Sequence, residues 1–81
     1  MFHTYILYSA DLDRYYIGSC QNIEERLRSH LSNHKGFTGK AKDWVVAYSE
    51  TYVTRTEAYA REREIKKWKS RKLVERLVAG N

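Results

Sequence analysis

The sequence contains no proline and only one cysteine, Cys20, among its 81 residues. A single cysteine excludes an intrachain disulfide and a zinc site built from several cysteines, so packing must hold the fold together. No apolar run approaches the ~18 residues that a membrane-spanning helix needs. Residues 1–4 also lack the basic and then apolar layout of a signal peptide. We therefore expect a cytoplasmic protein with no disulfide partner and no contact with a membrane.

The length and the charge of the chain narrow the classes of function. A chain of 81 residues cannot be divided into two cores that each fold, so we expect residues 1–81 to form one domain. The formal net charge is +5, an excess that favours polyanionic partners, with nucleic acid as the leading candidate. Part of this charge belongs to solvated helix surfaces, because residues of both signs are present.

Two stretches rich in aromatic and β-branched residues predict an antiparallel hairpin at the N-terminus. They are residues 2–8 and 14–18, and residues 10–13 between them are turn material. With residues 10 and 11 near the centre of the turn, Tyr5 and Tyr16 face each other across the pair, about 5 Å apart at Cβ. The two phenols then share one face of the sheet, where we expect the functional centre.

The first helix is predicted to begin at Asn22. Asn22 can cap a helix, and Glu25 three residues later completes the pattern of a capping box. Arg26 and His30 are four residues apart, so they stack on one edge of the helix, and that edge should face the sheet. Beside that edge runs an apolar stripe, which we expect to be buried: Ile23, Leu27 and Leu31.

The second half of the chain predicts a loop, a strand and two helices. Residues 32–42 are basic and have no apolar period, which is typical of an exposed loop, and residues 44–53 predict the third strand. Residues 54–57 form a capping box for a helix that reaches about Lys69, and Ser70 caps the last helix. The last helix should point four residues inward: Leu73, Val74, Leu77 and Val78. The fold class is therefore α+β, a small three-stranded antiparallel sheet flanked by helices in the order β-β-α-β-α-α.

Glu62 is the most informative position for function. Ala58, Glu62 and Ile65 fall within about 60° of one another on a helix, so the carboxylate lies inside the apolar stripe. An ionised carboxylate in such surroundings must protonate, bind a cation or pair with a base. The structural alternative is an ion pair with Arg26 or with a lysine.

Each tyrosine could likewise have a packing role or a functional role. The chain has seven, and most of them must be packing residues, because tyrosine is a favoured strand residue. Tyr5 and Tyr16 stand out because their expected face borders the edge of the helix that carries Arg26 and His30. Taken alone, Arg26 would more often be a surface residue and His30 a partly buried histidine.

Four sequence motifs occur in order along the chain. "HTY" at residues 3–5 and "YIG" at residues 16–18 resemble the paired signature of the GIY-YIG endonucleases, with only the tyrosine of the first motif intact. Arg26, ten residues after the tyrosine of the second motif, matches the arginine of the family. His30 matches a position held by His or Tyr, and Glu62 matches the metal-binding glutamate. The resemblance covers nearly the whole chain and is close to the small stand-alone bacterial members, so it implies the GIY-YIG nuclease fold.

The resemblance implies cleavage of a DNA phosphodiester with one divalent metal ion, Mg²⁺ or Mn²⁺, held by Glu62. In that chemistry Arg26 neutralises the charge that accumulates on the phosphoryl oxygens. Tyr5 or Tyr16 takes the proton of the attacking water, and His30 positions the water or relays the proton. Gly18 leaves room for backbone or substrate to approach the sheet. The asparagine that larger relatives carry beyond the glutamate is absent, as is their separate DNA-binding domain, so sequence selectivity should be poor.

The basic residues of the central loop and of the last helix junction are the expected contacts to the nucleic-acid backbone. They are Lys35, Lys40, Lys42, Lys66, Lys67, Lys69, Arg71 and Lys72. Their alternative role is a solvated helix face. The sequence thus predicts a metal-dependent endonuclease on DNA, with RNA as a second possible target and DNA repair or processing as its setting. We expect the protein to be a monomer or a weak homodimer. The alternative is a nucleic-acid-binding module with little or no turnover.

Overall fold

The computed structural model describes residues 1–31 and 37–80. Its strands are β1 (Phe2–Ser9), β2 (Arg14–Cys20) and β3 (Val45–Tyr52), and its α-helices are α1 (Ile23–Leu31), α2 (Arg55–Trp68) and α3 (Arg71–Ala79). This order confirms the predicted α+β fold. No helix in the described ranges is long and apolar enough to cross a membrane.

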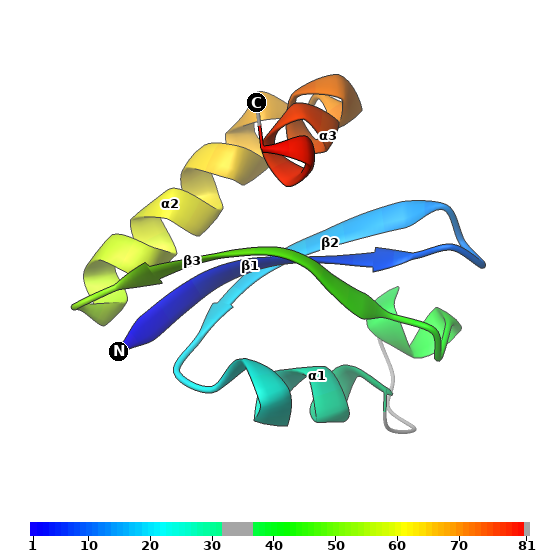
Figure 1. Cartoon of the computed structure of the whole chain (residues 1–81), viewed down its shortest axis with the longest axis horizontal. Coiled ribbons are helices and arrows are strands. Elements are labelled where there is room, and N and C mark those ends of the chain that lie inside the picture. Colours follow the sequence, from blue (N-terminus) through cyan, green and yellow to red (C-terminus); the bar gives the residue numbers. More distant parts are fainter. Residues whose placement is uncertain (32–36, 81) are drawn as a thin grey trace.

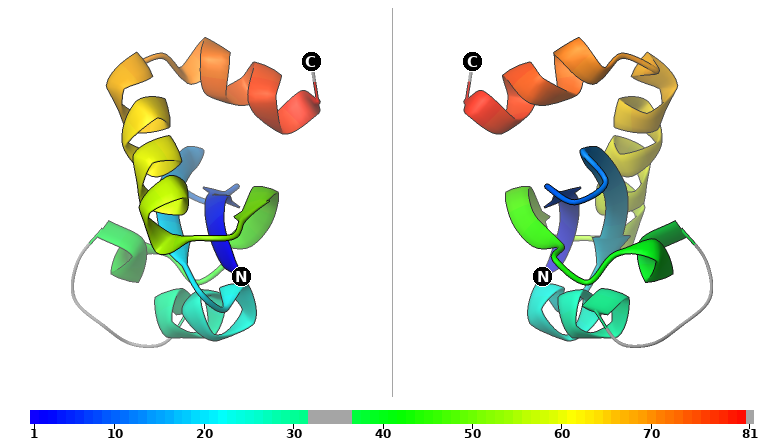
Figure 2. Two further views of the ribbon diagram at one scale, coloured as in Figure 1. Left: turned by 90° about the vertical axis from the view of Figure 1, so that its left-hand side faces the viewer. Right: turned by 90° about the vertical axis from the view of Figure 1, so that its right-hand side faces the viewer.

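The sheet has β1 at its centre and lies between two layers of helix. The three strands of the described residues are antiparallel in the order β2-β1-β3. α1 covers one face, and α2 and α3 cover the other (Figures 1 and 2). β2 is therefore an edge strand that both helical layers can approach.

Each face of the sheet has its own apolar core, because successive strand residues point to opposite faces. On the α2 and α3 side, Ile6 packs with Ile65 and Val74. On the α1 side, the next residue, Leu7, packs with Ala41 and Trp44. All these side chains are at most 6% exposed, and full burial of one large apolar side chain contributes roughly 1.5–3 kcal/mol.

The register of the hairpin differs from the prediction. Tyr5 pairs with Gly18, and Tyr16 pairs with Leu7, so the two tyrosines do not face each other directly. The turn centre lies between residues 11 and 12, because the turn uses four residues and ends at Asp13 in a left-handed conformation (φ 52). Tyr8 Oη and the Arg71 guanidinium both donate to the Asp13 carboxylate and hold it there. The shift changes the pairing by two residues, so both tyrosines remain on the same face.

The helix ends follow the predicted capping pattern. Asn22 Oδ1 accepts a hydrogen bond from Glu25 N at 3.0 Å. Thr54 and Glu57 form both bonds of a capping box, and Ser70 accepts from the backbone of α3. α2 ends one residue earlier than expected, at Trp68, because Lys69 takes a left-handed conformation (φ 47).

Three expectations about burial were wrong in part. The predicted loop contains a 3-10 helix at Phe37–Lys40, and Ala41 after it is buried against Trp44. Leu73 is 40% exposed, because it lies about 100° round α3 from Val74. In α1 the expected stripe is only half-buried, and His30 is the buried side chain: the half-buried residues are Ile23, Leu27 and Leu31.

Polar contacts fix α2 against the sheet. The buried Thr4 Oγ1 donates to the carbonyl oxygen of Ala58 at 2.7 Å. At the other edge of the sheet, the Glu50 carboxylate accepts hydrogen bonds from Tyr48, Tyr52 and Arg61. We refer to these four residues as the Glu50 cluster. It ties β3 to the middle of α2, one residue before Glu62.

Candidate active site

Three aromatic side chains from three elements meet on the α1 face of the sheet. Tyr5 comes from β1, Tyr16 from β2 and His30 from α1. Tyr5 Oη and His30 Nε2 share a hydrogen bond of 3.0 Å, and the Tyr16 ring lies 4.8 Å from the His30 ring and 6.5 Å from the Tyr5 ring. Tyr5 is 2% exposed and His30 7%, whereas Tyr16 is half-buried. As predicted, the His30 edge of the helix faces the sheet.

Gly18 makes the position of Tyr5 possible. A Cβ at Gly18 would lie 2.5 Å from Tyr5 Oη and 2.7 Å from the ring carbon that bears it. The sequence suggested that this glycine leaves room for backbone or substrate. In the structure the Tyr5 phenol fills that room, so Gly18 acts by letting the buried tyrosine reach His30.

The surroundings of Tyr5 keep its phenol protonated. Burial raises its pKa far above the ordinary value of 10.0, the neighbouring Tyr16 raises it further, and Arg26 opposes the shift. The negative charge of Glu62 also raises this pKa. Both Arg26 and Glu62 are therefore close enough to act electrostatically on the Tyr5 phenol.

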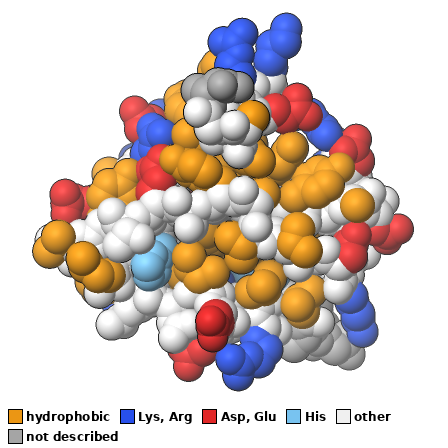
Figure 3. All heavy atoms as spheres, in the orientation of Figure 1, with side chains coloured by type: hydrophobic (Ala, Val, Ile, Leu, Met, Phe, Trp, Pro, Cys, Tyr) orange, Lys and Arg blue, Asp and Glu red, His pale blue; other side chains and the backbone are white. Residues whose placement is uncertain are grey.

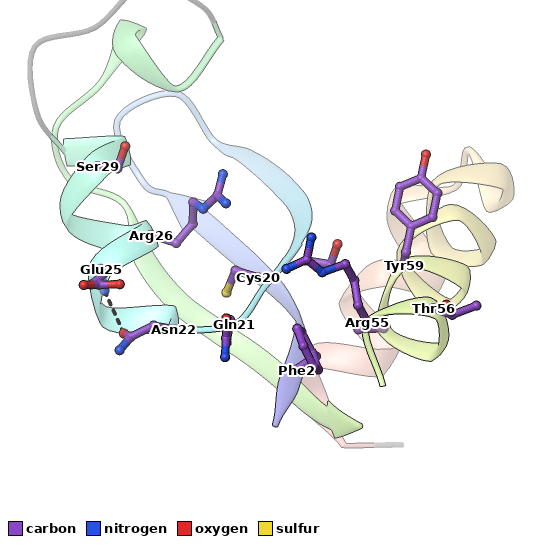
Figure 4. Close-up of a pocket in the computed structure, with 12 residues that line it drawn as sticks. Phe2, Cys20, Gln21, Asn22, Glu25, Arg26, Ser29, Arg55, Thr56 and Tyr59 are labelled. Carbon is purple, nitrogen blue, oxygen red and sulfur yellow. Dashed lines mark hydrogen bonds between the residues drawn. The ribbon is translucent and has the colours of Figure 1, made fainter. Parts of the chain in front are cut away.

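Arg26 lies beside this aromatic group in a cleft between α1 and the start of α2. The cleft has a volume of about 620 Å³, and the end of β2, with Ser19 and Cys20, forms part of its lining. Figure 4 shows the guanidinium group of Arg26 extending from α1 and that of Arg55 extending from α2, with Cys20 between them. Arg26 is exposed and so accessible to a ligand.

Glu62 is on α2, in line with buried residues as predicted. Ala58 and Ile65 are each 1% exposed, and the Glu62 side chain is 12% exposed. One carboxylate oxygen accepts from Ser19 Oγ at 2.6 Å and the other pairs with Lys66 Nζ at 2.6 Å. The lysine ion pair of the structural alternative is thus present, together with a serine contact that the sequence did not predict.

The expected centre on one face of the hairpin is wrong in one respect. Ser19 alternates with Gly18 and Cys20 along β2, so it points to the α2 face and Glu62 approaches the sheet from that side. Tyr5, Tyr16 and His30 lie on the α1 face. The two groups touch neighbouring residues of the edge strand β2: the Tyr5 phenol lies against Gly18 and Glu62 binds Ser19, which also lines the cleft.

Comparison with known protein families shows which family this chain belongs to. Residues 1–75 match the family described as the GIY-YIG catalytic domain. The chain belongs to the GIY-YIG family. GIY-YIG catalytic domains are nucleases, so this chain is a nuclease-type domain that acts on nucleic acid. Searches of curated proteins and of solved structures found no match.

The GIY-YIG domain offers a metal ion few protein ligands. Within residues 1–31 and 37–80, no three His, Cys, Asp or Glu side chains gather in a group that could hold a metal ion. Mg²⁺ accepts such sites, because it commonly keeps several waters and binds through one or two carboxylates and the substrate phosphate. Glu62, with the Ser19 hydroxyl on one carboxylate oxygen and the half-exposed Lys66 on the other, is the carboxylate of this region that could hold such an ion.

The predicted phosphate contacts of the GIY-YIG domain differ in their surroundings. Lys66 is paired with Glu62. Arg71 is held by Asp13 and Glu75, which ties α3 to the hairpin turn. Lys35 lies outside the described residues. The remaining members of the set are exposed: Lys40, Lys42, Lys67, Lys69 and Lys72.

One face of the domain carries its basic side chains at the periphery. In Figure 3, Lys and Arg side chains lie around the rim, and hydrophobic side chains gather across the middle. Val45 and Val46 of β3 are 55% and 39% exposed. Phosphate contacts from this face would therefore come from its rim.

The sequence did not single out three residues at the site, Ser19, Arg55 and Tyr59. Ser19 follows the "YIG" motif directly, and strand alternation could have placed it on the face opposite Gly18. Arg55 and Tyr59 are four residues apart on α2 and line the same cleft as Arg26. Their spacing is visible in the sequence, but the opposite wall of the cleft is not.

Proposed function

We propose that the protein is a divalent-metal-dependent endonuclease that cleaves DNA phosphodiester bonds with little sequence selectivity. The proposal rests on one arrangement in a GIY-YIG domain. Tyr5, Tyr16 and His30 pack together, and Arg26 and Glu62 are close enough to act electrostatically on the Tyr5 phenol. The same phosphate chemistry would serve RNA, and DNA repair or processing is the proposed setting.

Arg26 would bind the scissile phosphate. Its guanidinium lies in an open cleft, so a phosphate can reach it without displacing the core. Guanidinium groups bind phosphate oxygens with two parallel hydrogen bonds and remain charged at every physiological pH. Arg26 would therefore stabilise the negative charge that grows on the phosphoryl oxygens during attack by water.

Tyr16 rather than Tyr5 would take the proton of the attacking water. Tyr5 is buried, hydrogen-bonded to His30, and held in its neutral form by burial. The Tyr16 side chain is partly open to solvent and lies against the same histidine ring. Tyr5 then acts as a positioning residue that orients His30.

Glu62 would hold the metal ion. A divalent cation bound there supplies Lewis-acid stabilisation of the phosphate and of its leaving oxygen. The Ser19 hydroxyl orients one carboxylate oxygen, and Lys66 balances the carboxylate charge when no cation is bound. Because both contacts already occupy the carboxylate, Lys66 would have to give way.

The test of the proposal is nicking of a supercoiled plasmid by the purified protein with Mg²⁺ or Mn²⁺. Arg26→Ala should lower the rate by about 10²-fold or more, because a charge-stabilising donor is lost. Arg28→Ala is the matched control, since Arg28 is an exposed arginine on the same helix. Equal nicking by wild type and both variants would sink the proposal, because the cleavage would then come from a contaminant.

Tyr16→Phe and Tyr5→Phe should affect cleavage differently. Loss of a general base lowers the rate by about 10²- to 10⁴-fold, so Tyr16→Phe should show the larger fall in kcat. Tyr5→Phe removes the hydrogen bond to His30 and should lower kcat less, while reducing thermal stability. A larger kcat loss in Tyr5→Phe, with Tyr16→Phe near wild type, would reverse the assignment.

The second candidate function is a nucleic-acid-binding module with negligible turnover. It is favoured by the engagement of both Glu62 carboxylate oxygens by Ser19 and Lys66. In that case the exposed lysines near the 3-10 helix and near α3 would carry binding to the backbone. The protein would then bind DNA with a steep salt dependence and would leave the plasmid intact.

A further inference from the structure

The cleft beside Arg26 has features that phosphodiester cleavage itself does not require. Its α2 wall carries Arg55 and Tyr59, neither of which belongs to the aromatic group of the active site. Tyr59 is 53% exposed. The hydrolysis of a phosphate needs no exposed aromatic side chain at the edge of the cleft, so Tyr59 calls for another role.

Charge and size suit this cleft to a nucleotide. Its charged lining consists of Arg26, Arg55 and Glu25, so arginine outnumbers carboxylate two to one. Burial raises the pKa of the Cys20 thiol, so this part of the lining is neutral and does not repel a phosphate. The volume of about 620 Å³ lies within the roughly 300–1,000 Å³ of typical small-ligand sites.

The aromatic residues give the cleft π-surface beside its positive charge. The Arg55 guanidinium lies 5.4 Å from the centre of the Phe2 ring, and that of Arg63 lies 5.7 Å from the centre of the Tyr59 ring. Tyr59 is still half open to solvent, so its ring can accept a second planar group. Figure 4 shows its ring standing on α2 beyond Arg55.

We propose that this cleft binds an unpaired nucleotide next to the scissile phosphate, with its base stacked on Tyr59 and its backbone held by Arg26 and Arg55. The inference rests on the proposed function and names its substrate class: single-stranded DNA, or the unpaired strand of a branched DNA. In a continuous duplex each base is covered on both faces by its neighbours, so it cannot stack on a protein ring. Stacking on exposed aromatic residues beside a basic groove is how proteins hold single strands without reading sequence.

The test measures binding without cleavage, in EDTA, by fluorescence anisotropy with an oligonucleotide of about 12 nucleotides and with the matching duplex. Tyr59→Ala should weaken binding of the single strand by roughly 5- to 150-fold and binding of the duplex by much less. Tyr59→Phe keeps the ring and should restore binding. Arg55→Ala should weaken both and lower the salt slope by about one, whereas Arg28→Ala should do neither.

A second measurement locates the base. An oligonucleotide that carries 5-iodouracil should crosslink to Tyr59 on irradiation, and mass spectrometry of the peptides should find the adduct there. Unchanged single-strand affinity in Tyr59→Ala, an equal loss on the duplex, or adducts only outside the cleft would overturn the inference. Because no metal is present, these results stand apart from the nicking test: a protein that binds in this way and never cuts supports the cleft and refutes the endonuclease.

Discussion

Glu62→Gln should reduce cleavage by about 10³-fold, because a metal ion that stabilises the transition state contributes several kcal/mol. The amide keeps the shape of the side chain and can still accept a hydrogen bond from Ser19. It loses the charge that binds a cation. The cost in stability should be small, since the ion pair to Lys66 is an i,i+4 pair with a half-exposed lysine, and such pairs contribute about 0.3–0.5 kcal/mol.

The measurement has two parts, nicking of plasmid DNA and titration calorimetry of Mn²⁺ into the protein without DNA. Glu62→Gln should lose both the nicking and the heat of Mn²⁺ binding. Glu24→Gln, an exposed carboxylate of α1, is the control and should keep both. Lys66→Met removes the partner that competes for the carboxylate and should bind Mn²⁺ at least as tightly as wild type. Loss of Mn²⁺ binding in Lys66→Met with no change in Glu62→Gln would place the metal elsewhere.

Glu50→Ala should lower the free energy of unfolding by on the order of 3 kcal/mol. The Glu50 side chain is 18% exposed and is paired with Arg61. Its removal leaves two tyrosine hydroxyls without their acceptor and leaves the guanidinium with Glu64 as its remaining carboxylate partner. The total free energy of unfolding of a chain of 81 residues is only about 4–12 kcal/mol. Urea denaturation measures the change. Glu75→Ala, which removes an exposed pair with Arg71, is the control and should cost about 0.5 kcal/mol or less.

The contribution of Glu50 to the free energy of unfolding should also decrease as the pH falls. Burial alone raises the pKa of Glu50, but the hydrogen bonds from Arg61, Tyr48 and Tyr52 outweigh it and leave the pKa below its ordinary value of 4.5. A carboxyl whose pKa is lowered by folding stabilises the protein above its unfolded pKa, and this stabilisation is lost as the pH falls through the folded pKa. The difference between wild type and Glu50→Ala should therefore be full at neutral pH and shrink in acid. A constant difference would contradict this account.

Features set by neighbouring residues could be predicted from the sequence. Asn22, Thr54 and Ser70 cap their helices as expected, because a cap depends only on residues within one turn. The position of Glu62 between Ala58 and Ile65 follows from helix periodicity. The motif residues were found because their order along the chain resembles a family, which needs no knowledge of their geometry.

Features set by distant contacts could not be predicted. The hairpin register depends on the left-handed conformation of Asp13, which Arg71 stabilises from 58 residues away. The sequence places Glu62 on one side of α2 but cannot say that α2 covers the face of the sheet opposite α1. The role of Gly18 depends on the path of the Tyr5 ring, and the cleft exists only because α1 and α2 reach the same end of β2.

The central strand joins the two halves of the candidate active site through one peptide unit. Thr4 binds the carbonyl oxygen of Ala58 in α2, and the next residue, Tyr5, binds His30 in α1. The two helices are thus tied to opposite sides of β1 within about 3.8 Å of chain. A shift of β1 must therefore move both helices together, and with them the aromatic group on one face of the sheet and the carboxylate of α2 on the other.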